Sequence, residues 1–538
     1  MKKKLLFFFV AVSSLALSSC SFFNIDVNPS GGSFIPTGDD ASDDVEAEGI
    51  TSDYVDPNAD PISKPGSGLT SIKIVAINDF HGHVENKDGS MGLLKLGSYF
   101  LNQANTENTL IIDQGDTFQG SLYSNYNHGK LITDVYSYAH VHARTVGNHD
   151  FDWGIDKLKA CSSKEILDYK TPVLAVNVYD YDFATKVVGE NQQSDIGVKT
   201  VSYTLKNGLK VGIVGVIGKS QITSITTKLV DTITFTDHID VIKEEAVNLR
   251  NDGCDLVIAS CHTGQGDLTG NDLSDYVDLV LCGHTHYNES TTEGNLHYYQ
   301  FGAYGEGVGE ITLTYNYSTS SITSQESDFV DDFSSVTVNE NIRKIYDAYY
   351  NVAKDAGDIV VANDVRSAFY SGEQAANLMC KAILDQTKVE KFNVALSMCN
   401  NARELLPTGT WKYADLYESF PFDNVIYIID VWGSELRNEM SFASNLVCFN
   451  PKFDRTIDNS KRYRIAVLDY LAFHSNESRS YNYFPSVGYT TPIGTLKYNY
   501  RVILGNWLNK NGYNKGKTLK ATDFSNSVDE FNKNTVNQ

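Results

Sequence analysis

The fold is decided by the stretch IKIVAINDFHGH at residues 72–83, where an apolar run ends in a polar segment rich in potential metal ligands. Four further segments are similarly rich in His, Asp and Gly: DQGDTFQGS at 113–121, GNHDFD at 147–152, CHTG at 261–264 and GHTH at 283–286. In four of the five, the preceding residues are typical of a buried strand. Because open α/β sheets build their sites at the carboxyl ends of strands, the sequence predicts an α/β fold with a site at that edge.

These segments supply oxygen and nitrogen donors at spacings suited to divalent cations. Asp79 and His81 are two residues apart, so in an extended segment both side chains would leave the same face and bind one cation. Gly115 permits a sharp turn before Asp116, whose two carboxylate oxygens can bridge two cations. The remaining candidate ligands are Asn148, His262, His284 and His286. A mixed oxygen and nitrogen set without thiolate favours Zn, Mn, Fe or Co over Ca or Mg.

His149 is expected to have a different role from the other histidines. Asp152 lies three residues further on and can orient His149 as a general acid for a phosphoryl group. Two metals roughly 3.5–4 Å apart would clamp the attacking and leaving oxygens of the displacement. Each motif alone also has an ordinary structural explanation, as a turn, a helix cap or a buried histidine. The five motifs together favour a two-metal hydrolase.

The order D-x-H, GDxxQGS, GNHDFD, H-x-G and GHTH resembles the calcineurin-like metallophosphoesterases, in the branch of bacterial and ecto-5'-nucleotidases and UDP-sugar hydrolases. The resemblance implies a four-layer αββα domain followed by a smaller α/β (α+β) 5'-nucleotidase C-terminal domain. It also implies two divalent metals. One would be held by Asp79, His81, Asp116 and His286, and the other by Asp116, Asn148, His262 and His284. His149 and Asp152 would form the catalytic dyad.

The second domain resembles the family less closely. The segment PFDNVIYIIDVWGSEL at 421–436 matches the family's strand after its PF-x-N turn, which implies that Phe422 stacks on a nucleobase. Arg403 matches a phosphate-binding arginine, but the sequence MCNNAR at 398–403 lacks the family's glycines, and Ser371 replaces an earlier arginine. The late glycine-rich loop is also absent, and Tyr481 is the candidate for the second stacking residue. Phe422 as a core aromatic and Arg403 as a solvated charge remain alternatives.

The N-terminus indicates a location outside the cytoplasm. Three lysines at 2–4 precede the apolar stretch 5–12 and the sequence Leu17-Ser18-Ser19-Cys20. This pattern resembles a bacterial lipoprotein signal, which implies that Cys20 is lipidated and anchors the mature chain to the cell membrane. No other segment approaches the length of a transmembrane helix.

Composition and periodicity suggest the domain boundaries. Residues 1–20 are assigned to the signal peptide, and 21–69 to a disordered tether because they carry ten acidic residues and one lysine. The metallophosphoesterase domain is expected at 70–330. A linker helix is expected at 331–357, where Ile342, Ile345, Tyr346, Tyr349 and Val352 fall at helical spacing. The C-terminal domain is expected at 358–530.

Charge and cysteine content limit the remaining possibilities. The net charge of −23, from 67 acidic and 44 basic residues, argues against polymeric nucleic acid as a partner, because binding it needs a basic face. Seven cysteines follow Cys20, so at least one cannot pair within the chain. Cys261 and Cys282 lie on apolar strands and are expected to be buried small side chains.

The sequence therefore predicts an extracytoplasmic, lipid-anchored, two-metal phosphoesterase, with a 5'-nucleotidase acting on small nucleotides as the preferred function. A UDP-sugar, cyclic-nucleotide or other phosphoester hydrolase on the same core remains an alternative. So does a surface binding or adhesion lipoprotein that uses the fold as a scaffold. The substrate, the metal identity and the oligomeric state are left open.

Overall fold

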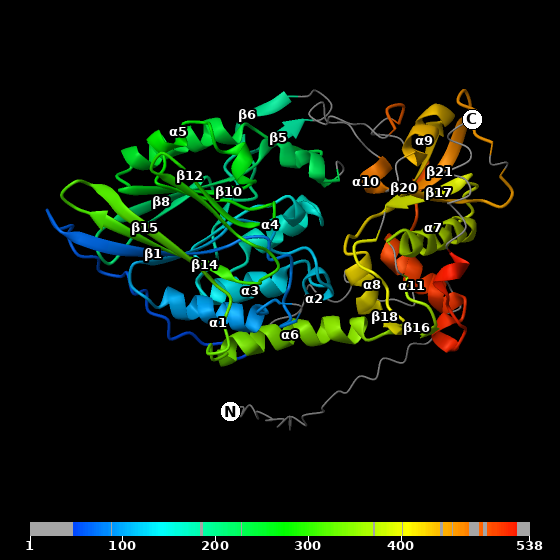
Figure 1. The fold of residues 1–538 in the computed structure, drawn as a ribbon, viewed down its shortest axis with the longest axis horizontal. Coiled ribbons are helices and arrows are strands. Elements are labelled where there is room, and N and C mark those ends of the chain that lie inside the picture. Colours follow the sequence, from blue (N-terminus) through cyan, green and yellow to red (C-terminus); the bar gives the residue numbers. More distant parts are fainter. Residues whose placement is uncertain are drawn as a thin grey trace, which may run out of the picture.

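The computed structural model of the protein describes residues 47–524 except for 88, 183–186, 227–228, 370–371, 401, 442–444, 454–455, 473–483 and 488–491. Cys20 with its predicted signal peptide, Ser371 and Tyr481 lie outside the described residues. The chain forms two domains, and α6 (Glu340–Gly357) runs along one side of the molecule from the first toward the second (Figure 1). Within the described ranges, no helix is long and apolar enough to cross a membrane.

Two six-stranded sheets pack face to face in the first domain. The first sheet, in the order β15-β14-β1-β2-β3-β4, contains β1 (Leu69–Ile77), β2 (Thr109–Asp113), β3 (Ala143–Thr145), β4 (Val173–Leu174), β14 (Val308–Asn316) and β15 (Ser321–Val330). The second, in the order β12-β13-β11-β10-β8-β7, contains β7 (Thr200–Thr204), β8 (Lys210–Ile217), β10 (Leu256–His262), β11 (Leu279–Leu281), β12 (Asn288–Glu293) and β13 (Leu296–Phe301). A small third sheet is made of β5 (Val178–Asp182), β6 (Val187–Gln193) and β9 (Ile233–Phe235).

The first strand, β1, illustrates why these sequences are apolar without interruption. Ile72, Ile74 and Ala76 belong to the core between the two sheets, whereas Val75 and Ile77 belong to the core beneath the helices. Successive side chains of a strand point to opposite faces, so both faces of β1 are buried. Burying one aliphatic side chain stabilises the fold by about 1.5–3 kcal/mol. The sheets therefore form a rigid support for the loops at their ends.

Helices cover the outer face of each sheet. They are α1 (Leu93–Ala104), α2 (Leu122–Asn125), α3 (Lys130–Tyr138), α4 (Ile155–Ser163) and α5 (His238–Asn251). Leu96 of α1 and Val135 of α3 share the core on the first sheet, and Ile242 and Leu249 of α5 pack in the core on the second sheet. The layer order is helix, sheet, sheet, helix, which confirms the predicted αββα arrangement.

The connecting helix α6 contributes to the cores of both domains. Its buried residues are Ile342, Ile345, Tyr346 and Tyr349 in the core of the first domain, and Ala353 and Ala356 in the core of the second. Asn339 caps the helix, because its side chain accepts hydrogen bonds from the backbone N–H groups of Asn341 and Ile342. The prediction that Val352 belongs to the buried face is wrong, since Val352 is 37% exposed.

The second domain is built on a mixed five-stranded sheet of order β20-β17-β21-β19-β22, as the predicted α/β (α+β) class requires. Its strands are β17 (Leu396–Asn400), β19 (Ile426–Trp432), β20 (Asn445–Phe449), β21 (Arg462–Leu468) and β22 (Gly494–Thr495), and a separate pair is formed by β16 (Val360–Val365) and β18 (Gly409–Lys412). The helices are α7 (Gly372–Val389), α8 (Tyr413–Ser419), α9 (Gly433–Met440), α10 (Asp469–Ala472) and α11 (Tyr500–Lys510).

The end of the predicted tether lies against the first domain, which corrects the expectation of free chain up to residue 69. The backbone oxygen of Thr51 accepts hydrogen bonds from Tyr138 Oη at 3.1 Å and from Asn341 Nδ2 at 2.8 Å. The Ile62 N–H donates to the oxygen of Lys206 at 3.0 Å. Composition suggested disorder because the segment is acidic, but these backbone hydrogen bonds depend little on side-chain type.

Candidate active site

All five motifs of the first domain follow a strand directly. Asp79, Asp116, Asn148, His262 and His284 follow or end β1, β2, β3, β10 and β11, respectively. The strand before Asn148, β3 (Ala143–Thr145), has only three residues. It is too short to form the apolar run that precedes each of the other four motifs. Because β1, β2 and β3 are parallel, as are β10 and β11, their carboxyl ends bring these residues to one edge of the fold.

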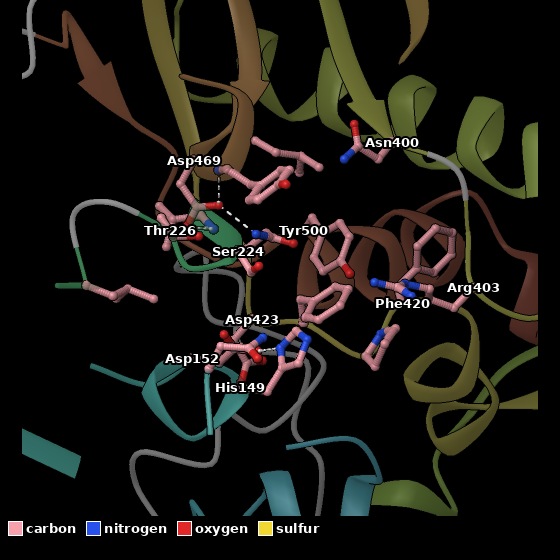
Figure 2. A pocket seen from close by; sticks show the side chains of 18 of the residues that line it. His149, Asp152, Ser224, Thr226, Asn400, Arg403, Phe420, Asp423, Asp469 and Tyr500 are labelled. Carbon is pink, nitrogen blue, oxygen red and sulfur yellow. Dashed lines mark hydrogen bonds and ion pairs between the residues drawn. The ribbon is translucent and has the colours of Figure 1, made fainter. Parts of the chain in front are cut away.

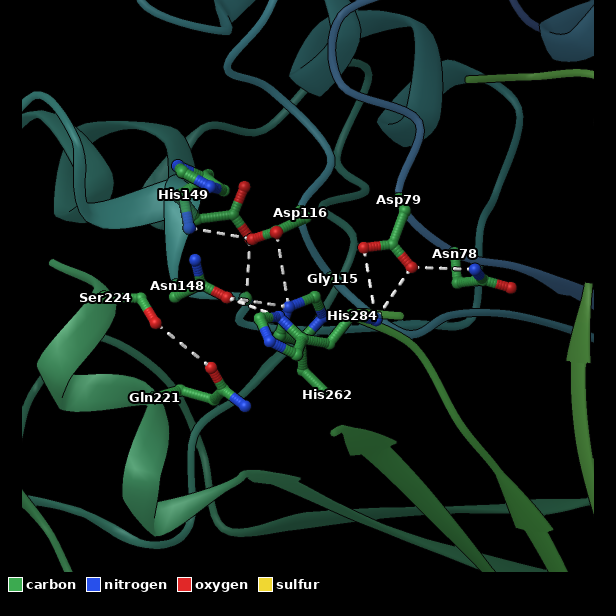
Figure 3. Close-up of polar contacts among 12 residues, drawn as sticks. Asn78, Asp79, Gly115, Asp116, Asn148, His149, Gln221, Ser224, His262 and His284 are labelled. Atoms are coloured by element: carbon green, nitrogen blue, oxygen red, sulfur yellow. Dashed lines mark hydrogen bonds and ion pairs between the residues drawn. The ribbon is translucent and has the colours of Figure 1, made fainter. Parts of the chain in front are cut away.

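The predicted metal ligands form two adjacent clusters. Figure 3 shows Asp79 of one cluster, and Asp116, His262 and His284 of the other. One cluster contains Asp79, His81 and His286, and the other contains Asp116, His262 and His284. In each, one ligand atom from every residue lies within 4.8 Å of the others. Asp116 Oδ2 lies 3.2 Å from His262 Nε2 and 3.7 Å from His81 Nε2. This carboxylate therefore reaches both clusters, as a bridging ligand must.

Asn148 lies beside the second cluster. Its Oδ1 is 3.1 Å from His262 Nε2 and 3.0 Å from His284 Nδ1. An amide oxygen is a neutral ligand, so it can join a metal site without adding charge. The structure thus brings together every metal ligand that the sequence suggested.

The donor set fits divalent metals because lone pairs face one another across each cluster. His81 Nδ1 is 2.9 Å from the backbone oxygen of Gln119, and His262 Nδ1 is 2.8 Å from that of Gln114. A ring nitrogen beside a carbonyl donates its hydrogen, which leaves the lone pair on Nε2 of both histidines. His262 Nε2 then faces two oxygen acceptors, and a cation satisfies all of them. Without a cation, a proton takes that place: burial would lower the pKa of His262, but Asp116 and Asp79 raise it to about 10, so positive charge is favoured here, from a proton or from a metal ion.

The backbone of the ligand segments is held in an unusual conformation. Five of the ligands have positive φ angles: Asp79 at 51°, His81 at 48°, Asp116 at 52°, His284 at 75° and His286 at 63°. The expectation of an extended segment around Asp79 and His81 is therefore wrong. A tight turn brings the two side chains together instead. A left-handed residue other than glycine costs on the order of 1–3 kcal/mol and is concentrated at functional sites.

Gly115 and Gly147 allow the loops after β2 and β3 to cross closely. A Cβ atom on Gly115 would lie 2.6 Å from the Gly147 nitrogen, and one on Gly147 would lie 2.2 Å from the Asp116 nitrogen. Any side chain at either position would push Asp116 and Asn148 apart.

His149 and Asp152 form a hydrogen-bonded pair next to the clusters. His149 Nδ1 lies 2.8 Å from Asp152 Oδ2. Burial would lower the pKa of His149, but the carboxylates of Asp152 and Asp116 raise it to about 9. These carboxylates therefore favour the protonated form of His149, with Nε2 as the nitrogen left for a substrate.

Asp150 is a site residue that sequence reasoning missed. Its Oδ1 accepts the N–H groups of Thr117 and Phe118 at 3.1 and 3.3 Å. Its Oδ2 accepts the N–H of Gly147 at 2.9 Å and Nη1 of the buried Arg144 at 3.1 Å. The carboxylate thus ties the loop of Asp116 to the loop of Asn148. The acidic residue within GNHD was the only signal in the sequence, and it resembled a helix cap.

A cavity of about 550 Å³ opens beside the dyad and is lined by both domains (Figure 2). The first domain contributes His149 and Asp152, and the second contributes Arg403, Phe422 and Tyr470. Phe422 is partly buried against the core of its own domain, and its ring stacks on His149 with centroids 5.7 Å apart. The Arg403 guanidinium lies 5.1 Å from the centre of the same ring.

Phe422 is not only a core aromatic residue, and Arg403 is not only a solvated charge. Phe422 packs on the core yet lines the cavity, and Arg403 is exposed to solvent yet lies over Phe422. Tyr470, on α10 just after β21, is an aromatic lining residue that no sequence pattern indicated. The predicted second stacking residue, Tyr481, lies outside the described residues.

The turn that carries Phe422 is fixed from both sides. Gln119 Nε2 and Asn125 Nδ2 of the first domain donate to the Pro421 oxygen at 3.1 and 2.9 Å. From the second domain, the fully buried Arg501 donates Nη1 to the oxygens of Phe420 and Phe422 at 2.6 and 2.8 Å. Arg501 also pairs with Asp423. Arg501 was not recognised in the sequence, because a lone arginine in an amphipathic helix usually faces solvent.

Comparison with known proteins agrees with this geometry. The calcineurin-like phosphoesterase family matches residues 72–288, and the 5'-nucleotidase C-terminal domain matches residues 352–447. The chain is 30% identical over 251 residues to an apyrase of Tabanus yao, covering 43% of this chain and 42% of the apyrase. It is 25% identical over 416 residues to a 5'-nucleotidase of Diplobatis ommata, covering 68% of this chain and 70% of the relative.

Another relative is the endonuclease YhcR of Bacillus subtilis, at 23% identity over 417 residues. That match covers 71% of this chain, and the chain spans about a third of the length of the endonuclease, 33%. The coverage of the apyrase is likewise below half of its length. The activities of these larger proteins therefore do not transfer to this chain directly.

Solved structures share the fold. The 5'-nucleotidase precursor of Thermus thermophilus superposes with a TM-score of 0.64 at 17% identity, covering 84% of this chain and 97% of that one. The 5'-nucleotidase of Candida albicans superposes with a TM-score of 0.57 at 13% identity, covering 84% and 99%. Residues 72–288 thus match the calcineurin-like phosphoesterase family, with both ligand clusters at the strand ends of this domain, and residues 352–447 match the 5'-nucleotidase C-terminal domain.

Proposed function

We propose that the protein is an extracytoplasmic 5'-nucleotidase, which hydrolyses nucleotides to nucleosides and phosphate. The observation that carries this proposal is the cavity between the domains, where the dyad of the first domain meets Phe422 and Arg403 of the second. We assign the phosphoesterase part to residues 70–330 and the substrate-covering part to residues 358–530. The cavity is large enough for a ligand of nucleotide size, since small-molecule sites are typically about 300–1,000 Å³.

His149 and Asp152 provide the proton chemistry. Asp152 accepts the Nδ1 hydrogen of His149 and so fixes the ring, and the Nε2–H group is left to face the phosphoester. The imidazolium can donate a hydrogen bond to a phosphoryl oxygen and then pass its proton to the leaving alkoxide. The raised pKa of His149 keeps the donor form available at neutral pH.

The remaining residues of the first domain supply the setting for bound metals. Asp79, His81, Asp116 and His286 would hold one divalent ion, and Asp116, Asn148, His262 and His284 the other. When bound, the two ions supply Lewis acidity that lowers the pKa of water and stabilises phosphoryl charge. Asp150 keeps the loops of Asp116 and Asn148 in register through its four hydrogen bonds.

In the second domain, Phe422 and Tyr470 are the proposed contacts for a nucleobase, and Arg403 is the proposed contact for phosphate. Base stacking on one aromatic side chain contributes about 1–3 kcal/mol. Arg403 lies over the Phe422 ring, so a base that stacks on that face would displace the guanidinium toward the phosphate. The amide of Asn424 and the carboxylate of Asp469 lie on the same wall and offer polar partners to a nucleoside.

A phosphoesterase of wider substrate range is the second candidate. The observation that favours it is the sequence MCNNAR at 398–403, which has no glycine next to Arg403. Glycines let backbone N–H groups approach a phosphate, so this wall contributes fewer such donors. UDP-sugars, cyclic nucleotides and simple phosphoesters would then be hydrolysed with similar efficiency.

The cellular location is proposed from the first twenty residues. The lysines, the apolar stretch 5–12 and Cys20 support export and lipidation at Cys20, with the enzyme on the outer side of the bacterial cell membrane. Replacing Cys20 by Ala should release the protein from the membrane fraction. A Cys20→Ala protein that still fractionates with membranes would remove the lipid anchor from the proposal.

A substrate panel tests the activity. The purified protein, loaded in turn with Zn, Mn, Co or Fe, should hydrolyse nucleoside monophosphates with a higher kcat/KM than a simple alkyl phosphate such as glycerol phosphate, whose leaving alcohol has a similar pKa. Nucleoside di- and triphosphates, cyclic nucleotides and UDP-sugars belong in the same panel. Equal kcat/KM values for nucleotides and the alkyl phosphate would replace the nucleotidase by the second candidate.

A further inference from the structure

Two cysteines of the second domain lie unusually close to each other. Cys380 lies on α7 and Cys399 on β17, and their sulfur atoms are 2.9 Å apart. Both side chains are buried, with relative exposures of 0% and 1%. Even carbon atoms, which are smaller than sulfur, rest roughly 3.5–4 Å apart when they are not bonded. The pair is thus closer than ordinary packing allows.

The surrounding hydrogen bonds hold the two sulfur atoms together. Ser397 Oγ donates to the backbone oxygen of Cys380 at 2.6 Å, and the thiol of Cys399 donates to that of Ala376 at 3.2 Å until oxidation removes its hydrogen. These bonds fix the facing positions of α7 and β17. A further approach of about 1 Å would bring the sulfur atoms to the usual S–S length of about 2.05 Å.

We propose that Cys380 and Cys399 form a disulfide bond in the mature protein. The two thiols lose two protons and two electrons, and the S–S bond forms. The electrons reduce a second disulfide, supplied by an oxidoreductase or a small-molecule disulfide, to two thiols through a mixed disulfide. Exchange must occur during folding, because both sulfur atoms are buried afterwards.

Cys448 is the nearest competitor and is expected to remain a thiol. It lies on β20 opposite Ser397, two positions along the ladder from Cys399. Residues directly opposite each other in a ladder share a face, as do residues two apart on one strand, so Cys448 and Cys399 lie on the same side of the sheet, toward α7. The sulfur atom of Cys399, by contrast, is already in contact with that of Cys380 on α7.

The cross-link would stiffen one wall of the cavity. β17 ends at Asn400, which lines the cavity, and the chain then continues to Arg403. Joining Cys399 to α7 fixes the end of this strand, and with it the start of the loop that carries Arg403. The bond closes a short loop within the domain, and such a bond stabilises a protein mainly by restricting its unfolded chain.

Disulfides persist in oxidising compartments. The presence of the Cys380–Cys399 bond in the cell therefore rests on the proposed extracytoplasmic location. The test therefore uses refolding in a defined redox buffer, which does not depend on location or on activity. The full-length protein is refolded with reduced and oxidised glutathione. It is then denatured and alkylated with iodoacetamide, with and without prior reduction, and its intact mass is measured.

The oxidised protein should take up two fewer alkyl groups than the reduced protein. Trypsin should yield one cross-linked pair, residues 367–381 with residues 392–403, because lysine or arginine borders each of these peptides. Cys254→Ser, a control in the first domain, should keep the difference of two groups. Cys399→Ser should abolish it and should lower the Tm of the oxidised protein by roughly 5–10 °C.

Equal alkylation before and after reduction would overturn the proposal. So would a cross-linked peptide that contains Cys448 in place of Cys399. If Cys399→Ser fails to fold, the mass and peptide measurements on the unmodified sequence still decide the outcome. The test does not measure nucleotidase activity. Its result therefore stands whether or not the proposed nucleotidase function is correct.

Discussion

The rings of His149 and Phe422 stack across the junction of the two domains, with centroids 5.7 Å apart and planes inclined by 26°. His149 belongs to the catalytic dyad proposed for the first domain, and Phe422 is the proposed base-stacking residue of the second. This contact places the phosphoester chemistry directly beside the aromatic wall of the cavity. A base on Phe422 and a phosphate near His149 can therefore belong to one small molecule.

Phe422→Ala should raise KM for nucleoside monophosphates about 5- to 150-fold, which corresponds to the loss of about 1–3 kcal/mol of stacking. Hydrolysis of a small aryl phosphate should change little, because that substrate has no base. Phe422→Tyr is the matched control and should retain stacking. Steady-state kinetics on both substrates measure the effect, and equal changes on both would mean that Phe422 only packs the domain.

His149→Asn should lower kcat by about 10²–10⁴, the usual contribution of general acid catalysis. Bound metal, measured by elemental analysis, should stay unchanged, because His149 is not one of the clustered ligands. Asp152→Asn should cause a smaller loss, since it weakens the orientation of the ring but keeps the donor. Loss of metal from His149→Asn would instead make His149 a ligand.

Asp116→Ala should remove the residue that reaches both clusters and so reduce both the metal content and the activity. The experiment compares bound metal per chain with that of Asp156→Ala, which changes an exposed acid on α4. Two bound metals and normal turnover in the Asp116 variant would contradict the bridging assignment.

Asp150→Ala should destabilise the protein by about 3–5 kcal/mol, because it leaves the buried Arg144 without its carboxylate. It should also weaken metal binding about 10- to 100-fold, since Asp150 positions the loops of Asp116 and Asn148. Denaturant unfolding measures the first effect and metal titration the second. Unchanged metal affinity in a folded variant would restrict Asp150 to a structural role.

Burial raises the pKa of Asp469 to about 6, whereas an unfolded chain has a value of about 4. The folded state therefore binds the carboxyl proton of Asp469 more tightly than the unfolded state does. The resulting contribution of Asp469 to the free energy of unfolding falls as pH rises between about 4 and 6. Above about pH 6 this contribution is fully lost. The Tm of the wild type relative to Asp469→Asn should accordingly decrease from pH 4 to pH 7. A difference in Tm that is constant with pH would assign an ordinary pKa to Asp469.

The sequence by itself determined the fold class and the ligands of the first domain. Apolar runs such as 72–77 can only be buried in a sheet covered on both faces, and polar residues at their ends must then gather at one edge. Such local patterns do not depend on which strands become neighbours. For this reason Asp79, Asp116, His262 and His284 could be identified before their partners were known.

Only the tertiary structure decided the conformations and contacts between distant segments. The left-handed turns at Asp79 and His81, the four bonds of Asp150 and the burial of Arg501 all depend on residues brought from elsewhere in the chain. The position of Phe422 likewise depends on the first domain, which supplies His149 and two donors to Pro421. Sequence patterns describe one segment at a time, whereas burial and pairing arise from how the segments pack together.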